Sequence, residues 1–340
     1  MQNIDEHTIT RAVLDRMAGC ENARLKEVLS ALVRHLHDFA REVHLTEAEW
    51  MAGIEFLTAT GHKCDDKRQE FILLSDALGL SMLTVVLNHS KGAQATEATV
   101  LGPFHVPDAP HFESGDDMSG GAKGEPLFVR AHVRGTDGRP VANAEVDVWE
   151  ADAEGFYDVQ RAGLDAAAGR GVFRTDATGA LHFRAVMPVA YPIPTDGPVG
   201  RLLSATGRHP WRPAHVHFMI KAPGYETLIT HVFRKGDPYL DSDAVFGVRS
   251  SLIGNFVSHV PGMAPDGTHA AACLSHAGLR FRAGAGQLTT VSRLDERDGM
   301  TCDHVFFVVY RYNVVRVFEP LQFDSPGADH RRSSPPSPLY

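Results

Sequence analysis

The chain has 340 residues, 43% of them hydrophobic and 22% charged, which is ordinary for a globular protein able to bury a large core. Its formal net charge of −9 argues against nucleic acid as the main partner, because phosphate binding requires a basic surface. The N-terminus lacks a basic start followed by an apolar run, and no apolar stretch approaches the roughly 20 residues of a membrane span, so we expect no secretory signal and no membrane insertion. The four cysteines include no C-x-x-C pair, which favours the reducing cytoplasm over a disulfide framework or zinc ribbon.

Residues 1–95 are predicted to form an N-terminal helical region. Over Leu25–Val43, apolar residues recur at the i, i+3, i+4, i+7 spacing of an amphipathic helix. Thr46 and Glu49 have the spacing of a capping box, which predicts the start of a second helix. A third, strongly apolar helical stretch follows, with a break predicted at Gly79. These helices form either a small domain or dimerisation arm, or a helical part of the main core.

The amino-acid composition changes after about residue 90, where a segment rich in Gly, Pro and Asp predicts a long loop into a second domain. Short alternating segments follow, separated by turn sequences such as GTDGRP, DATG and APGYE. Such a series favours an antiparallel β-sandwich. The expected strands are LFVRAHV, AEVDVWEA, ALHFRAVMP, AHVHFMI and TLITHVF.

The predicted fold is therefore mainly β with α, with the helical region over residues 1–95 followed by the sandwich over residues 96–322. Within the last part, HVFFVVYRYNVVRVF predicts a strand or a hairpin. Residues 323–340 have the composition of a disordered tail.

The stretch RPAHVHFMI places His215 and His217 on the same face of a strand, because side chains alternate along it. Val216, Phe218 and Ile220 then face the other way, into a core. On this spacing alone, the two imidazoles are either a metal site, with zinc as the default ion, or two ordinary core histidines.

Two tyrosines and an arginine precede this pair, namely Tyr157, Tyr191 and Arg212. Tyrosine is a poor ligand for zinc or magnesium at neutral pH, because its phenol titrates near about 10. A hard trivalent cation can hold it as phenolate, and two phenolates, two imidazoles and one hydroxide would balance the charge of Fe(III). A buried tyrosine with a hydrogen-bonded hydroxyl is also normal packing, so composition leaves both interpretations open.

The segment YPIPTDGPVGRLLSATGRHPWRPAHVHF resembles the core motif of the intradiol ring-cleavage dioxygenases, non-haem Fe(III) enzymes that open catechol-type rings. The similarity runs from about residue 8 to about residue 260, and REVHLTEAEW, RQEFILLSDALG, LGPFHVPDAP and VDVWEADAEGFYDVQ occur in the family's order. The resemblance implies a helical dimerisation region followed by a β-sandwich, in agreement with the patterning. It also implies a homodimer through the N-terminal helices, with a phospholipid at the helical interface in some relatives.

Carried over residue by residue, the resemblance implies that the ligands of Fe(III) are Tyr157, Tyr191, His215 and His217. Tyr191 would be the tyrosine that leaves the iron when the substrate binds. Arg212 would be a catalytic residue that stabilises negative charge on the diol. His231 occupies the position of a glutamine near the iron in catechol-cleaving relatives, and we count it among the catalytic residues.

The stretches THVF, GDPYLDSDAVFGV and EFILLSDALG resemble the subgroup that cleaves hydroxyquinol (1,2,4-trihydroxybenzene) with O2. The implied product is 3-hydroxy-cis,cis-muconate, the enol form of maleylacetate. Asp76 could accept a hydrogen bond from the extra ring hydroxyl, or it could simply cap or solvate its helix. The residues that would bind the substrate are Leu73, Asp76, Val100, Leu101, Gly102, Pro103, Phe104, Ile193, Pro194, Arg212 and Val245.

Two other functions stay open at this point. The first is a catechol or chlorocatechol 1,2-dioxygenase that gives cis,cis-muconates. Oxygen uptake measured with each diol distinguishes it from the favoured hypothesis, cleavage of hydroxyquinol. The second is a metal-free sandwich that acts as a binding module, for which a colourless, iron-free protein would be the sign.

Overall fold

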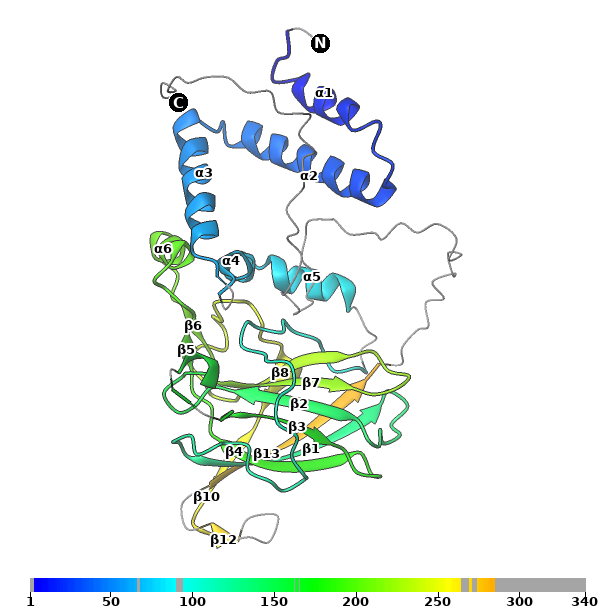
Figure 1. Cartoon of the computed structure of the whole chain (residues 1–340), viewed down its shortest axis with the longest axis vertical. Helices are drawn as coiled ribbons and strands as arrows, with labels where there is room; N and C mark the ends of the chain where they lie inside the picture. Colours follow the sequence, from blue (N-terminus) through cyan, green and yellow to red (C-terminus); the bar gives the residue numbers. More distant parts are fainter. Residues whose placement is uncertain are drawn as a thin grey trace, which may run out of the picture. The chain divides into compact units, whose positions relative to one another are not determined.

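The computed structural model describes residues 3–65, 68–89, 94–161, 163–164, 166–263, 269–270 and 274–284 (Figure 1). The strand or hairpin predicted at residues 304–318 and the tail predicted at residues 323–340 lie outside these ranges. The domain boundaries at residues 95 and 322 stay predictions.

The N-terminal region is helical, as predicted. Thr46 caps the helix that follows it, because its hydroxyl accepts from the Glu49 amide at 3.3 Å while the Glu49 carboxylate accepts from the Thr46 amide at 2.9 Å. Gly79 adopts a φ of +75°, which separates two short helices at the predicted break. The helices are α1 (Ile9–Arg16), α2 (Ala23–Glu42), α3 (Glu47–His62), α4 (Glu70–Ala77) and α5 (Leu80–Asn88).

Two β-sheets pack face to face and enclose one apolar core, which confirms the predicted sandwich (Figure 1). The first sheet has the order β10-β13-β1-β4, with β10 (Phe256–His259), β13 (Leu274–Ala283), β1 (Pro126–Gly135) and β4 (Ala180–Val186). The second has the order β3-β2-β7-β8-β9, with β3 (Arg170–Arg174), β2 (Glu145–Glu150), β7 (His215–Lys221), β8 (Leu228–Arg234) and β9 (Ile253–Gly254).

The sandwich departs from the prediction in strand direction. β13 pairs with β1 in parallel, and β9 pairs with β8 in parallel, whereas a fully antiparallel sandwich was expected. No hairpin turn constrains these pairs, because most of the sandwich separates β1 from β13 along the chain. Direction is then set by the packing of the completed sheet.

Smaller elements complete the described chain. The strand pairs are β5 (Tyr191–Pro192) with β6 (Trp211–Arg212), and β11 (Gly262–Met263) with β12 (His269–Ala270). A further helix, α6 (Pro198–Ala205), and two 3₁₀ helices, η1 (Asp158–Gln160) and η2 (Ser250–Leu252), lie in the connections. Among the described residues no single helix is long and apolar enough to cross a membrane; only the bent pair of α4 and α5, at 77°, reaches that length and composition together.

The two faces of β7 have different environments. Val216, Phe218 and Ile220 lie in the core between the sheets, as the alternation predicted. His215 and His217 point from the opposite face of the same sheet. The second face therefore carries the polar side chains.

Polar and apolar contacts hold α4, and the residues just before it, against α6 and the loop that precedes α6. Arg68 pairs with Asp196 at 2.7 Å, and the buried Glu70 carboxylate accepts from the Val199 amide at 3.1 Å. A second buried apolar cluster holds α4 against α6 and neighbouring loops; its members are Leu73, Ala77, Ile193, Val199, Leu203, Ala244 and Val245. This cluster brings α4 close to the polar face of β7.

Candidate metal centre

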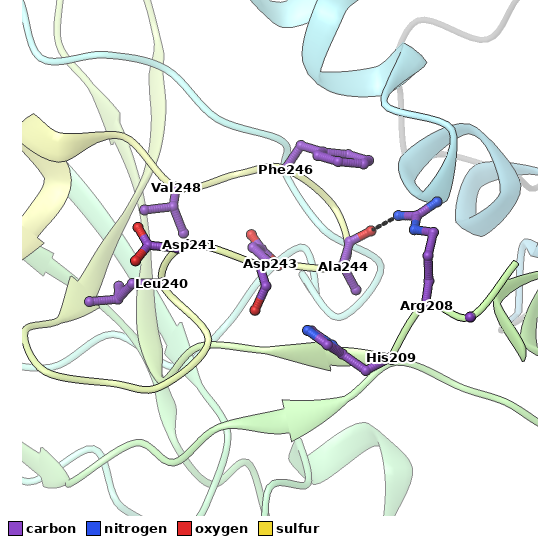
Figure 2. A pocket seen from close by; sticks show the side chains of 10 residues that line it. Arg208, His209, Leu240, Asp241, Asp243, Ala244, Phe246 and Val248 are labelled. Atoms are coloured by element: carbon purple, nitrogen blue, oxygen red, sulfur yellow. Dashed lines mark hydrogen bonds between the residues drawn. The ribbon is translucent and has the colours of Figure 1, made fainter.

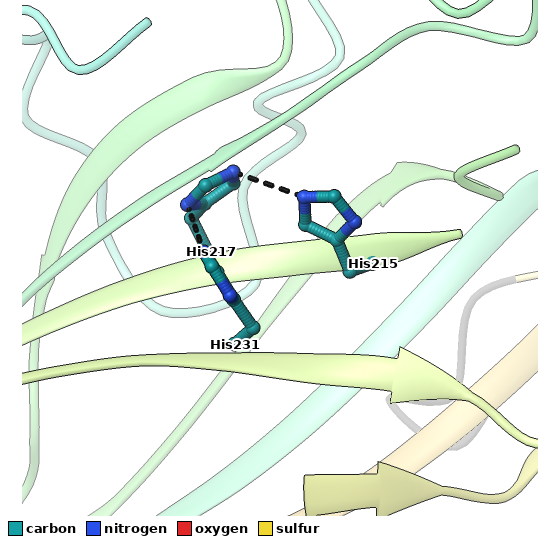
Figure 3. Close-up of side chains that lie close together, drawn as sticks. All are labelled: His215, His217 and His231. Carbon is teal, nitrogen blue, oxygen red and sulfur yellow. Dashed lines mark hydrogen bonds between the residues drawn. The ribbon is translucent and has the colours of Figure 1, made fainter. Parts of the chain in front are cut away.

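Four polar atoms from four buried side chains meet on that face. The Tyr157 hydroxyl lies 3.0 Å from His217 Nε2 and 3.2 Å from the Tyr191 hydroxyl. The Tyr191 hydroxyl lies 3.4 Å from His215 Nε2, and the two Nε2 atoms lie 3.2 Å apart (Figure 3). The structure therefore brings together the four residues implied as ligands by the sequence resemblance.

Different elements deliver these side chains. The histidines project from β7, Tyr191 lies on β5 directly opposite Arg212 of β6, and Tyr157 precedes η1. Gly155, with a φ of +83°, allows the close approach of two loops, since a Cβ there would lie 2.9 Å from the Tyr191 Cβ. The site is thus assembled from segments that are distant in sequence.

Both imidazoles present a lone pair to the centre. His215 Nδ1 donates to the Pro213 carbonyl at 2.6 Å, which leaves its Nε2 as an acceptor. His217 Nδ1 lies 2.7 Å from His231 Nε2, so His217 donates and His231 accepts in the arrangement that frees His217 Nε2. Ligating histidines are oriented in this way by an acceptor on the second nitrogen.

Burial determines the protonation of the site. It lowers the pKa of His215 to about 3, with a further contribution from the charge of Arg212, and it lowers the pKa values of His217 and His231 well below the usual range. These imidazoles are therefore neutral, as ligation requires. Burial also raises the pKa of Tyr157 well above its usual value, so only a bound cation of high charge would hold it as phenolate.

A three-histidine alternative exists among the described residues. One ring nitrogen from each of His215, His217 and His231 lies within 4.8 Å of the others, which would suit zinc (Figure 3). That set would break the hydrogen bond between His217 and His231, and it would leave two phenols unused beside it. The two-tyrosine, two-histidine set keeps this bond, and its hard oxygen donors fit a trivalent iron ion better.

Arg212 is held rigidly next to the four donors. Its Nε lies 3.1 Å from Asp243 Oδ1, and its Nη2 lies 3.3 Å from Asp243 Oδ2, while its Nη1 reaches to 3.3 Å from His215 Nε2. The Asp243 carboxylate also accepts from the Gly247 amide at 2.9 Å. No local pattern identifies Asp243 as the partner of Arg212, because the two residues lie 31 positions apart in the chain.

The residues predicted to bind the substrate fall into three groups. Leu73, Ile193 and Val245 belong to the second apolar cluster, and Val100 and Leu101 are buried. Gly102 and Phe104 touch ligand residues: a Cβ at Gly102 would lie 3.0 Å from His217 Cε1, and the Phe104 ring stacks on Tyr157 at 4.4 Å. Pro103 and Pro194 are only half-buried.

Asp76 is the predicted substrate residue with an unusual environment. It is 4% exposed, and its Oδ1 has no hydrogen-bond partner. Burial raises the pKa of Asp76 to about 6. The Oδ1 atom can therefore accept a hydrogen bond from a polar ligand.

A pocket of about 490 Å³ lies against the loop that carries Asp243 (Figure 2). It is lined by Gly207, Arg208, His209, Leu240, Asp241, Ser242, Asp243, Ala244, Phe246 and Val248. None of the predicted substrate residues lines it. The Arg208 side chain closes one end by donating to the Ala244 carbonyl at 3.1 Å.

Known protein families and characterised relatives match much of the chain. Residues 100–272 match the family described as dioxygenase, and residues 22–96 match the family described as catechol dioxygenase N terminus. The chain is 65% identical over 262 residues to the 6-chlorohydroxyquinol 1,2-dioxygenase of Cupriavidus pinatubonensis, covering 77% of this chain and 95% of that protein. It is 52% identical over 268 residues to the hydroxyquinol 1,2-dioxygenase of Corynebacterium glutamicum, covering 78% and 89%.

Solved structures of dioxygenases share the fold of this chain. The hydroxyquinol 1,2-dioxygenase of Pseudomonas putida DLL-E4 matches with a TM-score of 0.78 at 46% identity, over 83% of this chain and 99% of that one. The catechol 1,2-dioxygenase of Pseudomonas arvilla C-1 matches with a TM-score of 0.73 at 26% identity, over 87% and 97%.

Proposed function

The chain belongs to the intradiol ring-cleavage dioxygenases, and we propose that it opens hydroxyquinol-type rings with O2 at a Fe(III) ion held by Tyr157, Tyr191, His215 and His217. The observation that carries the proposal is the convergence of two buried phenols and two neutral imidazoles whose Nε2 atoms face one another. Hydroxyquinol would give 3-hydroxy-cis,cis-muconate, the enol of maleylacetate.

The bound ion would supply Lewis acidity toward the two adjacent ring oxygens. The protein's own groups act around it. The Tyr191 oxygen would accept one of the two protons that the diol loses, and the hydroxide that completes the charge balance would accept the other. The Nη1 group of Arg212 faces the same centre and stabilises negative charge on the diol, and Asp243 prevents its rotation by pairing with Nε and Nη2. The apolar cluster that includes Leu73 and Val245 excludes water.

Asp76 is the residue we assign to recognition of the third ring hydroxyl. Its unpartnered Oδ1 would accept a hydrogen bond from a hydroxyl that hydroxyquinol has and catechol lacks. Near pH 7 the side chain is mainly a carboxylate, since burial raises its pKa only to about 6. When catechol binds, this buried acceptor is left without a hydrogen-bond donor, so the site discriminates against catechol.

A second ring, 6-chlorohydroxyquinol, is favoured by one observation. The chain is 65% identical to an enzyme named for that substrate and 52% identical to one named for hydroxyquinol. We therefore include the chlorinated ring among the substrates.

Oxygen uptake tests the function directly. Iron-loaded protein of measured metal content is assayed with hydroxyquinol, 6-chlorohydroxyquinol and catechol, and kcat/KM is compared. We expect both trihydroxylated rings to be preferred. A clear preference for catechol would contradict the substrate assignment, and an iron-free, colourless protein without turnover would contradict the metal centre.

The N-terminal helices are proposed to form a homodimer, with a phospholipid between them. Exposed apolar side chains crowd α2, α3, α4 and α5 and the residue after α2: Leu32, Leu36, Phe39, Val43, Trp50, Met51, Ile54, Leu57, Phe71, Leu80, Leu83, Val86 and Leu87. So extensive an apolar surface is typical of an interface. Light scattering would give the mass of the assembly, and solvent extraction would release a lipid.

We place the enzyme in the cytoplasm. Cys20 and Cys64, the cysteines within the described residues, are free thiols. Fractionation of the source cells would test the location.

A further inference from the structure

A row of buried rings crosses the five-stranded sheet beside the metal centre. In the strand register, Trp149 of β2 lies opposite His217 of β7, and His231 of β8 lies opposite His217 on the other side. The indole stacks on the His217 ring with centroids 4.7 Å apart and planes at 18°, whereas the His231 ring meets it edge-on at 4.1 Å and 88°. The His217 ring is thus enclosed on two sides by other rings.

A largely buried hydrogen-bonded pair of side chains supports the indole from outside the ligand set. His105 Nε2 lies 2.7 Å from Asp147 Oδ2, and each of these side chains is 9% exposed. The His105 ring meets Trp149 edge-on, with centroids 4.8 Å apart and planes at 66°. Asp147 precedes Trp149 by two residues on β2, so both project from the same face of the sheet. His105 therefore contacts Trp149 while its bond to Asp147 fixes its orientation.

The loop that carries His105 contacts the centre at two further points. Gly102 faces His217 Cε1, and the Phe104 ring stacks on Tyr157. Arg170 of β3 donates from Nη1 to the Phe104 carbonyl at 3.0 Å, which ties the loop to the sheet. The His105–Asp147 pair is therefore part of a frame around two of the four donors.

This frame has a physical reason beyond packing. Strand pairing sets the position of the His217 Cα but leaves the rotation of its ring free, and that rotation decides where Nε2 points. A stacked indole restricts the rotation, provided that the indole itself cannot turn. The polar pair that holds the indole carries a desolvation penalty that apolar residues would avoid, and His105 Nδ1 and Trp149 Nε1 lack hydrogen-bond partners among the described residues.

We propose that His105 and Asp147 are positioning residues, which act through Trp149 to fix the plane of the His217 imidazole and the direction of its Nε2 lone pair. The inference rests on the proposed iron site. His105 contacts Trp149 and bonds to Asp147, so the pair acts on the ligand His217 through the indole.

The test uses the iron-loaded enzyme and three substitutions. His105→Ala removes both the ring and the bond to Asp147, His105→Gln keeps a donor for Asp147 but loses the ring, and Asp147→Asn keeps an acceptor for His105. The measurements are the visible absorption band of the Fe(III)–tyrosinate centre, the rate of iron loss to a chelator, and kcat and KM. For His105→Ala we expect a shifted band and a loss of iron affinity or kcat of about 10- to 100-fold, the range seen for outer-shell partners of metal ligands. Asp147→Asn keeps the acceptor, so its band and iron affinity should stay near those of the wild type. His105→Gln loses the ring, so its band and iron affinity should resemble those of His105→Ala.

Thr175→Val is the matched control. Thr175 is buried at the end of β3, accepts from the Ala144 amide at 2.8 Å and donates to the Val141 carbonyl at 2.7 Å, but it lies apart from the ligands. Its loss should lower the melting temperature without moving the absorption band. If His105→Ala behaves like this control, with an unshifted band and unchanged iron affinity, the inference is wrong.

Two further outcomes are decisive. Should His105→Ala not fold, His105→Gln is judged by the same band and iron affinity, and an unshifted band overturns the inference. A wild-type enzyme that neither binds iron nor shows the band would overturn the proposed function itself, and the inference with it. A coloured, active wild type with unaffected variants would overturn the inference alone.

Discussion

The N-terminal helices and the polar face of the sandwich use buried surface in opposite ways. Every residue of β7 except Lys221 is buried, and its polar side chains find partners within the same chain. No residue of α2 is fully buried, and Leu36 and Phe39 are 54% and 52% exposed. One region is complete in a single chain, whereas the other has an apolar surface suited to a second copy. Chemistry and assembly should therefore be separable by substitution.

The largest effect on chemistry is expected from the ligand tyrosines. Tyr191→Phe removes one phenolate donor and the acceptor of a diol proton, so turnover should fall by at least about 100-fold. The protein should stay folded and keep its assembly, because within the described part of the chain the Tyr191 hydroxyl is hydrogen-bonded to the Tyr157 hydroxyl and His215 Nε2 and to no element of the N-terminal helices. Oxygen uptake, light scattering and circular dichroism check this, and near-normal activity would refute the assignment of Tyr191.

A smaller but still large effect is expected at Arg212. Arg212→Lys keeps the positive charge but loses the two-point pairing with Asp243, so kcat should fall on the order of 10²-fold with little change in iron content. Steady-state kinetics and metal analysis measure the two effects. If the lysine variant turns over like the wild type, charge alone suffices and the rigid pairing is unimportant.

Asp76 should show a trade between stability and selectivity. Asp76→Asn weakens the acceptor for the third hydroxyl, so kcat/KM for hydroxyquinol should fall about 10-fold relative to catechol. The same substitution should raise stability at pH 7. Folding raises the pKa of Asp76 from 3.8 to about 6, so ionisation destabilises the native state increasingly as the pH rises from about 4 to about 6.

Denaturant unfolding measures this second effect. Below about pH 4 the wild type and Asp76→Asn should differ little, because Asp76 is then protonated in both the folded and the unfolded states. At pH 7 the variant should be more stable by up to about 3 kcal/mol. Equal pH dependence in the two proteins would show that Asp76 does not titrate as described.

The smallest effect on chemistry is expected from the helices. Leu36→Glu places a charge on the exposed apolar face of α2, so it should dissociate the proposed dimer while leaving kcat per subunit close to that of the wild type. Arg24→Glu, at an exposed polar position of the same helix, is the control and should leave the assembly intact. Sedimentation velocity with activity assays distinguishes the two, and a monomeric wild type would remove the contrast between the regions.

Three local patterns in the sequence predicted features that the structure shows. The alternation along β7, the capping box at Thr46 and the break at Gly79 all appear in the structure, since each depends on the geometry of a few consecutive residues. The implied ligand set came from resemblance to a family, because spacing alone left zinc and core packing open.

Only the tertiary structure decided which residues act on one another across the sheet. It pairs β13 with β1 in parallel and places His231 Nε2 next to His217 Nδ1. It also stacks Trp149 on His217 and packs His105, which bonds to Asp147, against Trp149. These contacts join residues far apart in the chain, and they depend on strand register and on the packing of the whole sandwich. A short window of sequence holds the periodicity of a strand, but the free energy that selects its neighbours is distributed over the complete fold.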